Sequence, residues 1–227
     1  MNMNVYTMCR SGNHAIIFWL INNICTVDHN IQGAVYWNNE KKLYYYNNCN
    51  HLSYNFIENY NHLIKSFEDT DMDTNIRYGD INIIILRDYK NFIASRYKKY
   101  GSKLGLNNSY LQNYEQIRDL WIRLCDQIIN NDKIIGIIYN SWLTSKEYRD
   151  NICSKLGIIN TNDNTSIVSD IGEGSSFCGV KLEEDSTLYL NRFNEKLFEN
   201  DIELLQKILD DYENNESIKK IKKILFD

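Results

Sequence analysis

Short apolar runs alternate with amphipathic stretches along the chain, and this alternation predicts an α/β protein. The clearest strand is the unbroken β-branched run Ile81–Leu86, and Ile134–Tyr139 is a second run of the same kind. Continuous apolar runs of this length are typical of strands that are buried on both faces. Val5–Cys9 is predicted as the first strand, and Gly33–Trp37 and His62–Phe67 are predicted as further strands.

Apolar residues at helical spacing predict helices between these strands. The predicted helices cover residues 15–24, 88–99, 110–130 and 144–156, and a capping box of Asn200 and Glu203 opens a last helix that ends near Tyr212. Residues 158–180 are polar and rich in Gly and Ser, which predicts a long loop. We therefore expect one domain over residues 1–227, with a three-layer α/β/α fold around a mainly parallel sheet. Ligands of such sheets bind at the carboxyl ends of the strands.

Composition narrows the class of protein. The chain has 25 Lys+Arg against 30 Asp+Glu, a formal net charge of -5, which argues against a dedicated nucleic-acid binder. The longest apolar run, residues 15–24, is too short to span a membrane. The six cysteines form no CxxC pair and the four histidines have no metal-ligand spacing, so we expect reduced thiols and no metal. Without a secretory signal, we expect a cytoplasmic protein.

The chain also has a biased amino-acid usage and one basic run. The chain has no proline, few alanines and many Asn, Ile and Tyr residues, which indicates an A/T-biased genome. Codon bias alone therefore explains some losses of proline and some gains of asparagine. The basic run Lys219–Lys223 follows an acidic stretch and is interpreted as the solvated face of a helix.

The turn Cys9–His14 has the chemistry of an anion site. Gly12 lets the backbone approach a ligand, and the start of the following helix presents unpaired N–H groups with a partial positive charge. Side chains of Arg10, Ser11, Asn13 and His14 add hydrogen-bond donors. The turn is not a Walker A motif, because the lysine and the magnesium-binding Ser/Thr are missing. A polar turn without a ligand is the alternative.

A second turn offers a similar set of groups. Arg87 follows the Ile81–Leu86 strand, and Ser95 comes eight residues later, about two helical turns along the next helix. A guanidinium and a hydroxyl suit a phosphate monoester. The alternative is a surface ion pair between Arg87 and Asp88.

The order and spacing of these two turns resemble the sulfotransferase family, whose members use 3′-phosphoadenosine 5′-phosphosulfate (PAPS) on a P-loop-like α/β fold. The family motif P-[KR]-S-G-T-T is matched by C-R-S-G-N-H, in which Arg10, Ser11 and Gly12 agree and Asn13 and His14 replace two threonines. The stretch R-S-G-N-H-A-I also resembles a subgroup from bacteria and large DNA viruses. Cys9 stands at the proline position, Ala15 follows where many members have an aromatic residue, and the C-terminal R-K-G-x-x-G loop is absent.

This resemblance implies roles for particular residues. Residues 10–15 would bind the 5′-phosphosulfate, and Arg87 with Ser95 would bind the 3′-phosphate, without a metal. Arg10 and His14 would stabilise charge on the sulfuryl group, and Glu68 is the predicted general base, next to Phe67 at the usual base position. Lys65 is a second-rank contact to the sulfuryl end. In the long loop, Ser175 and Ser176 would donate to phosphate and Phe177 would stack on adenine; a flexible linker is the alternative.

The acceptor is predicted only by class, as a small molecule or a glycan with a hydroxyl group. Trp37 and the run Tyr44–Tyr46 are candidates for its pocket, although core packing explains aromatic residues equally well, as it does for Trp121 and Trp142. Two other functions stay open. One is a catalytically inactive protein that binds the product 3′-phosphoadenosine 5′-phosphate (PAP) or another nucleotide, and the other is a P-loop-type small-molecule kinase. The oligomeric state is not predicted.

Overall fold

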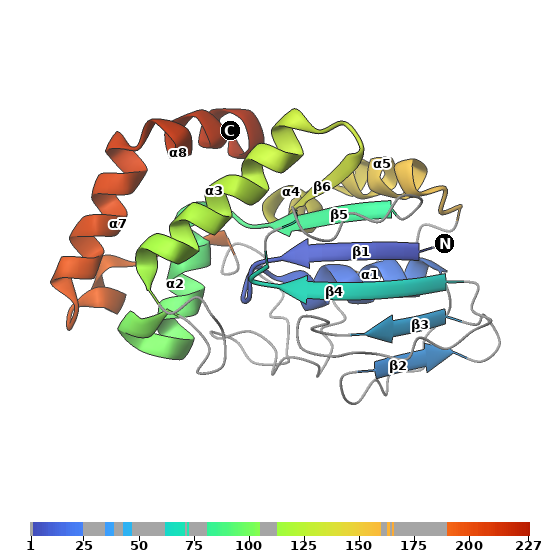
Figure 1. Cartoon of the computed structure of the whole chain (residues 1–227), viewed down its shortest axis with the longest axis horizontal. Coiled ribbons are helices and arrows are strands. Elements are labelled where there is room, and N and C mark those ends of the chain that lie inside the picture. Colours follow the sequence, from blue (N-terminus) through green and yellow to red (C-terminus); the bar gives the residue numbers. More distant parts are fainter. Residues whose placement is uncertain are drawn as a thin grey trace.

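The central sheet contains six strands of the described residues. The computed structural model describes residues 2–24, 35–38, 43–46, 62–70, 72, 81–104, 113–159, 163, 165 and 190–227. The strands are β1 (Asn2–Thr7), β2 (Val35–Asn38), β3 (Leu43–Tyr46), β4 (His62–Glu68), β5 (Ile81–Leu86) and β6 (Ile134–Ile138). Their order is β2-β3-β4-β1-β5-β6. Only the β2–β3 pair is antiparallel, so the sheet is mainly parallel (Figure 1).

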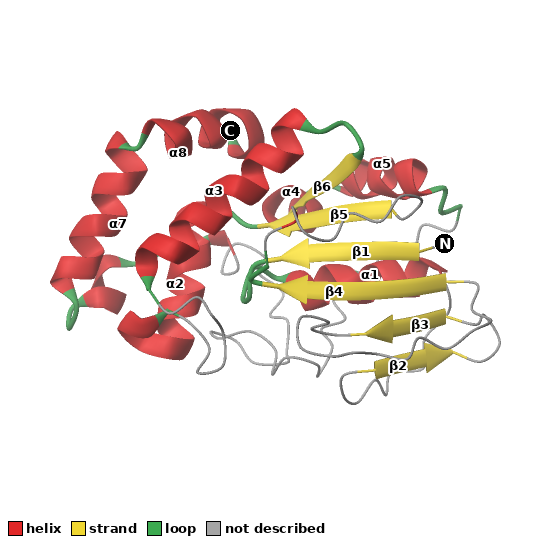
Figure 2. Ribbon diagram, in the orientation of Figure 1, coloured by secondary structure: helices red, strands yellow, loops and turns green. Residues whose placement is uncertain are grey.

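Of the described α-helices, one follows β1, two lie between β5 and β6, and the others follow β6 (Figure 2). The α-helices are α1 (Asn13–Ile24), α2 (Tyr89–Tyr100), α3 (Tyr114–Asn130), α4 (Tyr139–Thr144), α5 (Lys146–Leu156), α7 (Ile202–Asn214) and α8 (Glu216–Ile221). Short 3₁₀ turns cover Gly101–Lys103 and Glu195–Phe198, and a π-helical turn covers Lys222–Phe226.

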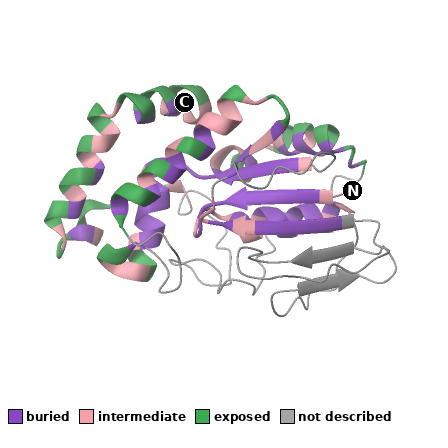
Figure 3. Cartoon of the chain, viewed as in Figure 1, coloured by how far each residue is buried: buried purple, intermediate pink, exposed green. Residues whose placement is uncertain are grey.

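Each face of the sheet is covered by its own apolar cluster. Alternate residues of β1 separate the two clusters, because Met3 and Val5 pack with α1, α4 and α5, whereas Tyr6 packs with α2, α3, α7 and α8. β1 and β5 are almost entirely buried, as Figure 3 shows. The predicted three-layer α/β/α fold with a mainly parallel sheet is confirmed. Trp121 and Trp142 are core residues, each 1% exposed.

Several predicted element boundaries were wrong. The first strand ends at Thr7, two residues before Cys9, since Ser11 N bonds to Met8 O and the chain already turns there. α7, the helix predicted to end near Tyr212, is capped by Asp201, whose side chain accepts a hydrogen bond from Leu204 N, and not by Asn200. β3 and α4 were not predicted. The basic run lies on α8 and the π-helical turn, with Lys219 and Lys220 exposed, as expected for a solvated helix face.

The parallel register aligns the carboxyl ends of the central strands along one edge of the sheet. Thr7 of β1 lies beside Glu68 of β4 and Ile85 of β5, and Leu86 lies beside Ile138 of β6. The segments that follow β1, β4, β5 and β6 therefore meet at this edge, which Figure 1 shows as the end where the arrowheads of these strands lie together. Among the described helices, none has the length and apolarity needed to cross a membrane.

Candidate functional site

The first turn, Met8–Gly12, links β1 to α1 at the carboxyl edge (Figure 2). Arg10 has a φ of 72° and is partly exposed. The Ser11 side chain is buried, and its hydroxyl lies 2.6 Å from the Thr7 hydroxyl. The turn therefore uses Ser11 to close on β1, and a contact from Ser11 to phosphate stays a prediction.

Gly12 is required by the packing of the turn against Tyr139, the first residue of α4. Gly12 has a φ of 87°, and a Cβ added to it would lie 2.3 Å from Cδ2 and Cε2 of the Tyr139 ring. Both the backbone conformation and the space therefore exclude a side chain. Tyr139 is buried and follows β6 directly. Its ring therefore packs the carboxyl end of β6 against the first turn, which follows β1. The sequence reasoning did not identify Tyr139.

Glu68 lies at the end of β4 and points to the start of α1. Its Oε1 atom accepts a hydrogen bond of 2.5 Å from Asn13 Nδ2 and lies 3.7 Å from His14 Nε2. Glu68 and Asn13 are buried, and the His14 side chain is 19% exposed. The structure thus brings together three predicted site residues, one carboxylate and two side chains of the first helical turn. The base role of Glu68 stays a prediction.

Arg87 in the second turn is a buried cation. It is 1% exposed, and its guanidinium carbon lies 4.4 Å from the centroid of the Tyr139 ring. Burial lowers the pKa of Arg87 below its ordinary value, and this outweighs the effects of Tyr139 and Asp88, which raise it. Asp88 caps α2 by accepting from Asn91 N. The burial of Arg87 argues against the alternative of an ion pair at the surface.

Ser95 meets an arginine that the sequence reasoning missed. Its buried hydroxyl accepts a hydrogen bond of 3.0 Å from Arg192 Nη1, 97 residues later. Asn91 of α2 fixes this segment, because its Oδ1 accepts from the backbone N–H groups of Arg192 (2.5 Å) and Phe193 (2.8 Å). Arg192 is itself buried. One signal was available, since Arg192 is the only arginine after Arg149 in a segment rich in lysine.

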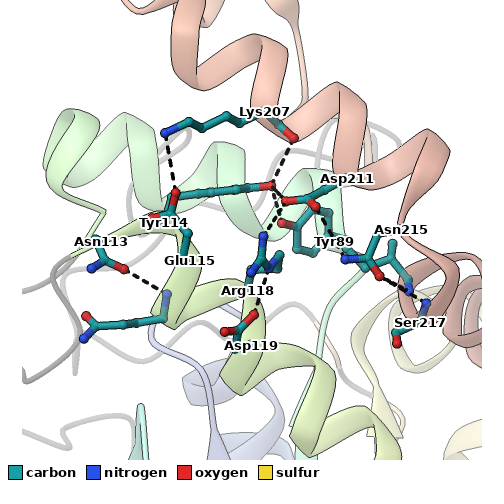
Figure 4. Close-up of polar contacts among 12 residues, drawn as sticks. Tyr89, Asn113, Tyr114, Glu115, Arg118, Asp119, Lys207, Asp211, Asn215 and Ser217 are labelled. Atoms are coloured by element: carbon teal, nitrogen blue, oxygen red, sulfur yellow. Dashed lines mark hydrogen bonds and ion pairs between the residues drawn. The ribbon is translucent and has the colours of Figure 1, made fainter.

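The C-terminal segment is held by a chain of buried hydroxyl groups (Figure 4). The hydroxyls of Tyr89 and Tyr114 lie 2.5 Å apart, and Tyr114 donates over 2.7 Å to Asp211 Oδ2 of α7. Burial raises the pKa of both tyrosines, so both keep their protons. Trp121 Nε1 donates to the carbonyl of Arg87 over 3.0 Å. α3 therefore fixes the second turn, and the tyrosines join α2 and α3 to α7.

The remaining predicted residues are placed as follows. Ala15 packs against the core on the α1 face. Lys65 is buried, and strand alternation puts it on the sheet face opposite Glu68, together with Phe67, which stacks on Tyr6 at 5.1 Å. Lys65 therefore does not point to the same side as Glu68. The side chains of Trp37 and Tyr44–Tyr46, and the residues Ser175, Ser176 and Phe177, lie outside the part that the structure describes.

Cys9 is a buried thiol at this edge. Cys9, Cys125 and Cys153 are free and buried, and burial together with Glu68 and Asp69 raises the pKa of the Cys9 thiol to about 12. Cys9 is therefore a neutral thiol at physiological pH. Among the described residues, no group of three His, Cys, Asp or Glu side chains has the arrangement needed to hold a metal ion.

Comparisons with known proteins give a distant match in structure only. No family model matches the chain, and no curated protein sequence is significantly similar to it. Among solved structures, the chain is similar to mouse sulfotransferase SULT7A1 complexed with PAP. This match has 11% sequence identity and a TM-score of 0.44, and it covers 98% of this chain and 88% of the mouse chain.

Proposed function

We propose that the chain binds PAPS at the carboxyl edge of the sheet and transfers its sulfuryl group to an acceptor hydroxyl. The observation that carries this proposal is the pair of basic turns on adjacent strands β1 and β5, which both pack against the ring of Tyr139. A ligand with negative groups at two separate positions fits such a pair. PAPS has this character, with a 3′-phosphate at one position and a 5′-phosphosulfate at the other.

The proposed 3′-phosphate site is formed by Arg87, Ser95 and Arg192. Both guanidiniums are buried, at 1% and 7% exposure, and the Ser95 hydroxyl already contacts Arg192. Desolvation is unfavourable for the charged form of Arg87, so an anion that approaches it recovers electrostatic energy that water does not supply there. Arginine forks match phosphate oxygens in geometry as well as in charge.

The proposed 5′ site is the first turn with the N-terminus of α1. The conformation of Gly12 allows a close backbone approach, and the first N–H groups of the twelve-residue helix α1 favour negative charge. Arg10 and His14 would stabilise the charge that develops on the sulfuryl oxygens and on the bridging oxygen of the 5′-phosphate. PAPS supplies the activated sulfuryl group when it is bound, and no metal is assigned to this chemistry.

In the transfer, the acceptor oxygen forms a bond to sulfur while the bond from sulfur to the bridging oxygen breaks. The acceptor proton must leave at the same time, and we propose that Glu68 takes it. Its Oε1 is held by Asn13 and faces His14, which keeps the carboxylate beside the residues that would hold the sulfuryl group. We propose a cytoplasmic enzyme that acts on a small-molecule or glycan hydroxyl.

The test combines ligand binding with transfer. Thermal unfolding is measured with PAP and with Mg-ATP, each at about a hundred times its dissociation constant, where a specific ligand stabilises by about 2.7 kcal/mol. The proposal predicts a shift with PAP, followed by transfer of labelled sulfate from PAPS to a member of a panel of glycans and phenols. A shift with Mg-ATP alone contradicts the proposal and favours the kinase. Binding of PAP without any transfer favours an inactive nucleotide-binding protein.

A further inference from the structure

Three residues with side chains adopt left-handed backbone conformations in the described part of the chain. They are Arg10 with a φ of 72°, Asp69 with a φ of 52° and Leu104 with a φ of 51°. Side chains disfavour this region, so such conformations persist where the surrounding structure holds them, and they gather at functional sites. These three come from different segments, namely the first turn, the end of β4 and the end of the 3₁₀ turn after α2.

One guanidinium makes a hydrogen bond at or directly beside each of these three positions. Arg96, on α2, is fully buried, and it donates from Nη1 and Nη2 to the two carboxylate oxygens of Asp69 over 2.7 Å and 3.0 Å. Its Nη1 also donates to the carbonyl of Cys9, the residue before Arg10, over 3.3 Å, and its Nε donates to the carbonyl of Leu104. Burial opposes the charge on Arg96, but the charge and hydrogen bonds of Asp69, together with Cys9 and Tyr100, raise its pKa overall.

Asp69 completes the grip on the first turn. Its Oδ1 accepts a hydrogen bond of 3.0 Å from Cys9 N, and its own N–H donates to the carbonyl of Thr7 over 2.9 Å. Both backbone polar groups of Cys9 are therefore bound by the ion pair, directly before the left-handed residue Arg10. These hydrogen bonds to the N–H and the carbonyl of Cys9 restrict the backbone that positions Arg10.

We propose that Arg96 is a positioning residue that holds the first turn in its anion-binding conformation before any ligand arrives. The inference rests on the proposed function, because it assigns the turn to the 5′ end of the nucleotide. Arg96 also follows Ser95 directly, so a single helix carries a contact for the proposed 3′-phosphate site and the clamp for the 5′ site. The two halves of the site are thereby fixed relative to each other.

The substitution Arg96→Lys separates positioning from charge. Lysine keeps the positive charge beside Asp69 but lacks the fork that reaches the two carbonyls and both carboxylate oxygens together. The turn then has to be ordered when the ligand binds, and ordering one residue corresponds to about a tenfold loss of affinity. The loss is specific for the 5′ group, because Arg87, Ser95 and Arg192 are unchanged.

The experiment compares PAP with 3′-AMP, which lacks the 5′-phosphate, by titration calorimetry. In the wild type, the dissociation constant of 3′-AMP divided by that of PAP measures the contribution of the 5′-phosphate. Arg96→Lys is expected to lower this ratio about tenfold. The control is Arg149→Lys, a buried arginine whose Nε contacts Asp163 over 2.6 Å and whose Nη1 contacts the Trp142 carbonyl over 2.6 Å. The control should leave the ratio unchanged.

Failures of the two proposals are distinguishable. A wild-type chain that does not bind PAP contradicts the proposed function, whereas PAP binding with an unchanged ratio in Arg96→Lys overturns the positioning role alone. If Arg96→Lys does not fold, hydrogen exchange of the ligand-free wild type decides. If Arg96 and Asp69 hold Cys9 in the ligand-free protein, the Cys9 amide exchanges as slowly as the amides inside β1. Exchange of the Cys9 amide at the rate of an open loop overturns the inference.

Discussion

Replacement of Arg87 by methionine should abolish recognition of the 3′-phosphate while leaving the fold intact. Arg87 is 1% exposed, and burial lowers the pKa of its guanidinium. In the ligand-free protein, the charge therefore carries a desolvation cost that the ring of Tyr139, 4.4 Å away, offsets only in part. Methionine fills similar space without a charge, so the free energy of unfolding should change by about 1 kcal/mol or less.

The effect on binding should be much larger. Hydrogen bonds to charged groups contribute about 1.5–3 kcal/mol each, and an arginine makes two to a phosphate in the bidentate arrangement. A loss of about 3 kcal/mol corresponds to roughly a hundredfold weaker binding of PAP. The affinity for 5′-AMP, which has no 3′-phosphate, should stay within about twofold, because the site proposed for its phosphate is the first turn.

The assay is titration calorimetry with both nucleotides, together with urea unfolding of the ligand-free protein. The control is Arg123→Met, which removes an exposed arginine from α3 and should change neither affinity. Arg87 does not bind the 3′-phosphate if Arg87→Met retains the wild-type preference for PAP over 5′-AMP. A loss of several kcal/mol of stability without ligand would show instead that Arg87 is a structural cation.

Three further predictions test other parts of the site. Gly12→Ala should lower the free energy of unfolding in urea by about 2–4 kcal/mol, because the new Cβ meets the Tyr139 ring at a φ of 87°. The control Gly157→Ala, at a φ of 67° with no atom within 4 Å, should lower it by only about 1 kcal/mol. Equal losses would contradict the role of the ring. Glu68→Gln keeps an oxygen for Asn13 but cannot take a proton, so PAP affinity should hold while sulfate transfer falls about a hundredfold; retained turnover moves the base elsewhere. The Cys9 thiol has a pKa raised to about 12, so its contribution to stability is present below pH of about 9 and is lost as the pH rises toward 12. Between pH of about 8 and 10, the free energy of unfolding in urea should therefore decline less for Cys9→Ala than for the wild type. Equal declines would contradict the raised pKa.

The sequence was sufficient where local patterns decide the structure. The runs Ile81–Leu86 and Ile134–Ile138 are strands because both faces of the sheet are covered, and only such strands tolerate continuous apolar residues. The alternation of strands and helices predicts that the first and second turns lie at one edge of the sheet. The combination of Arg10 with Arg87 could therefore be anticipated from sequence, because it follows from the topology of parallel sheets.

Tertiary contacts between distant segments could not be anticipated in the same way. Arg192 reaches Ser95 because Asn91 binds the backbone of its segment, and no local pattern encodes that docking. Tyr139 reads as the last residue of an apolar strand, although it begins α4 and fills the space over Gly12. The opposite directions of Lys65 and Glu68 were predictable from strand alternation, since three positions separate them.

The central claim is that two anion sites on adjacent strands bind one ligand with two negative groups. Titration calorimetry of the wild-type chain with PAP, 5′-AMP and 3′-AMP tests it most directly. PAP is expected to bind roughly a hundredfold tighter than either monophosphate, because each site adds about 3 kcal/mol. An affinity for PAP no greater than that for the better monophosphate would contradict a two-part site.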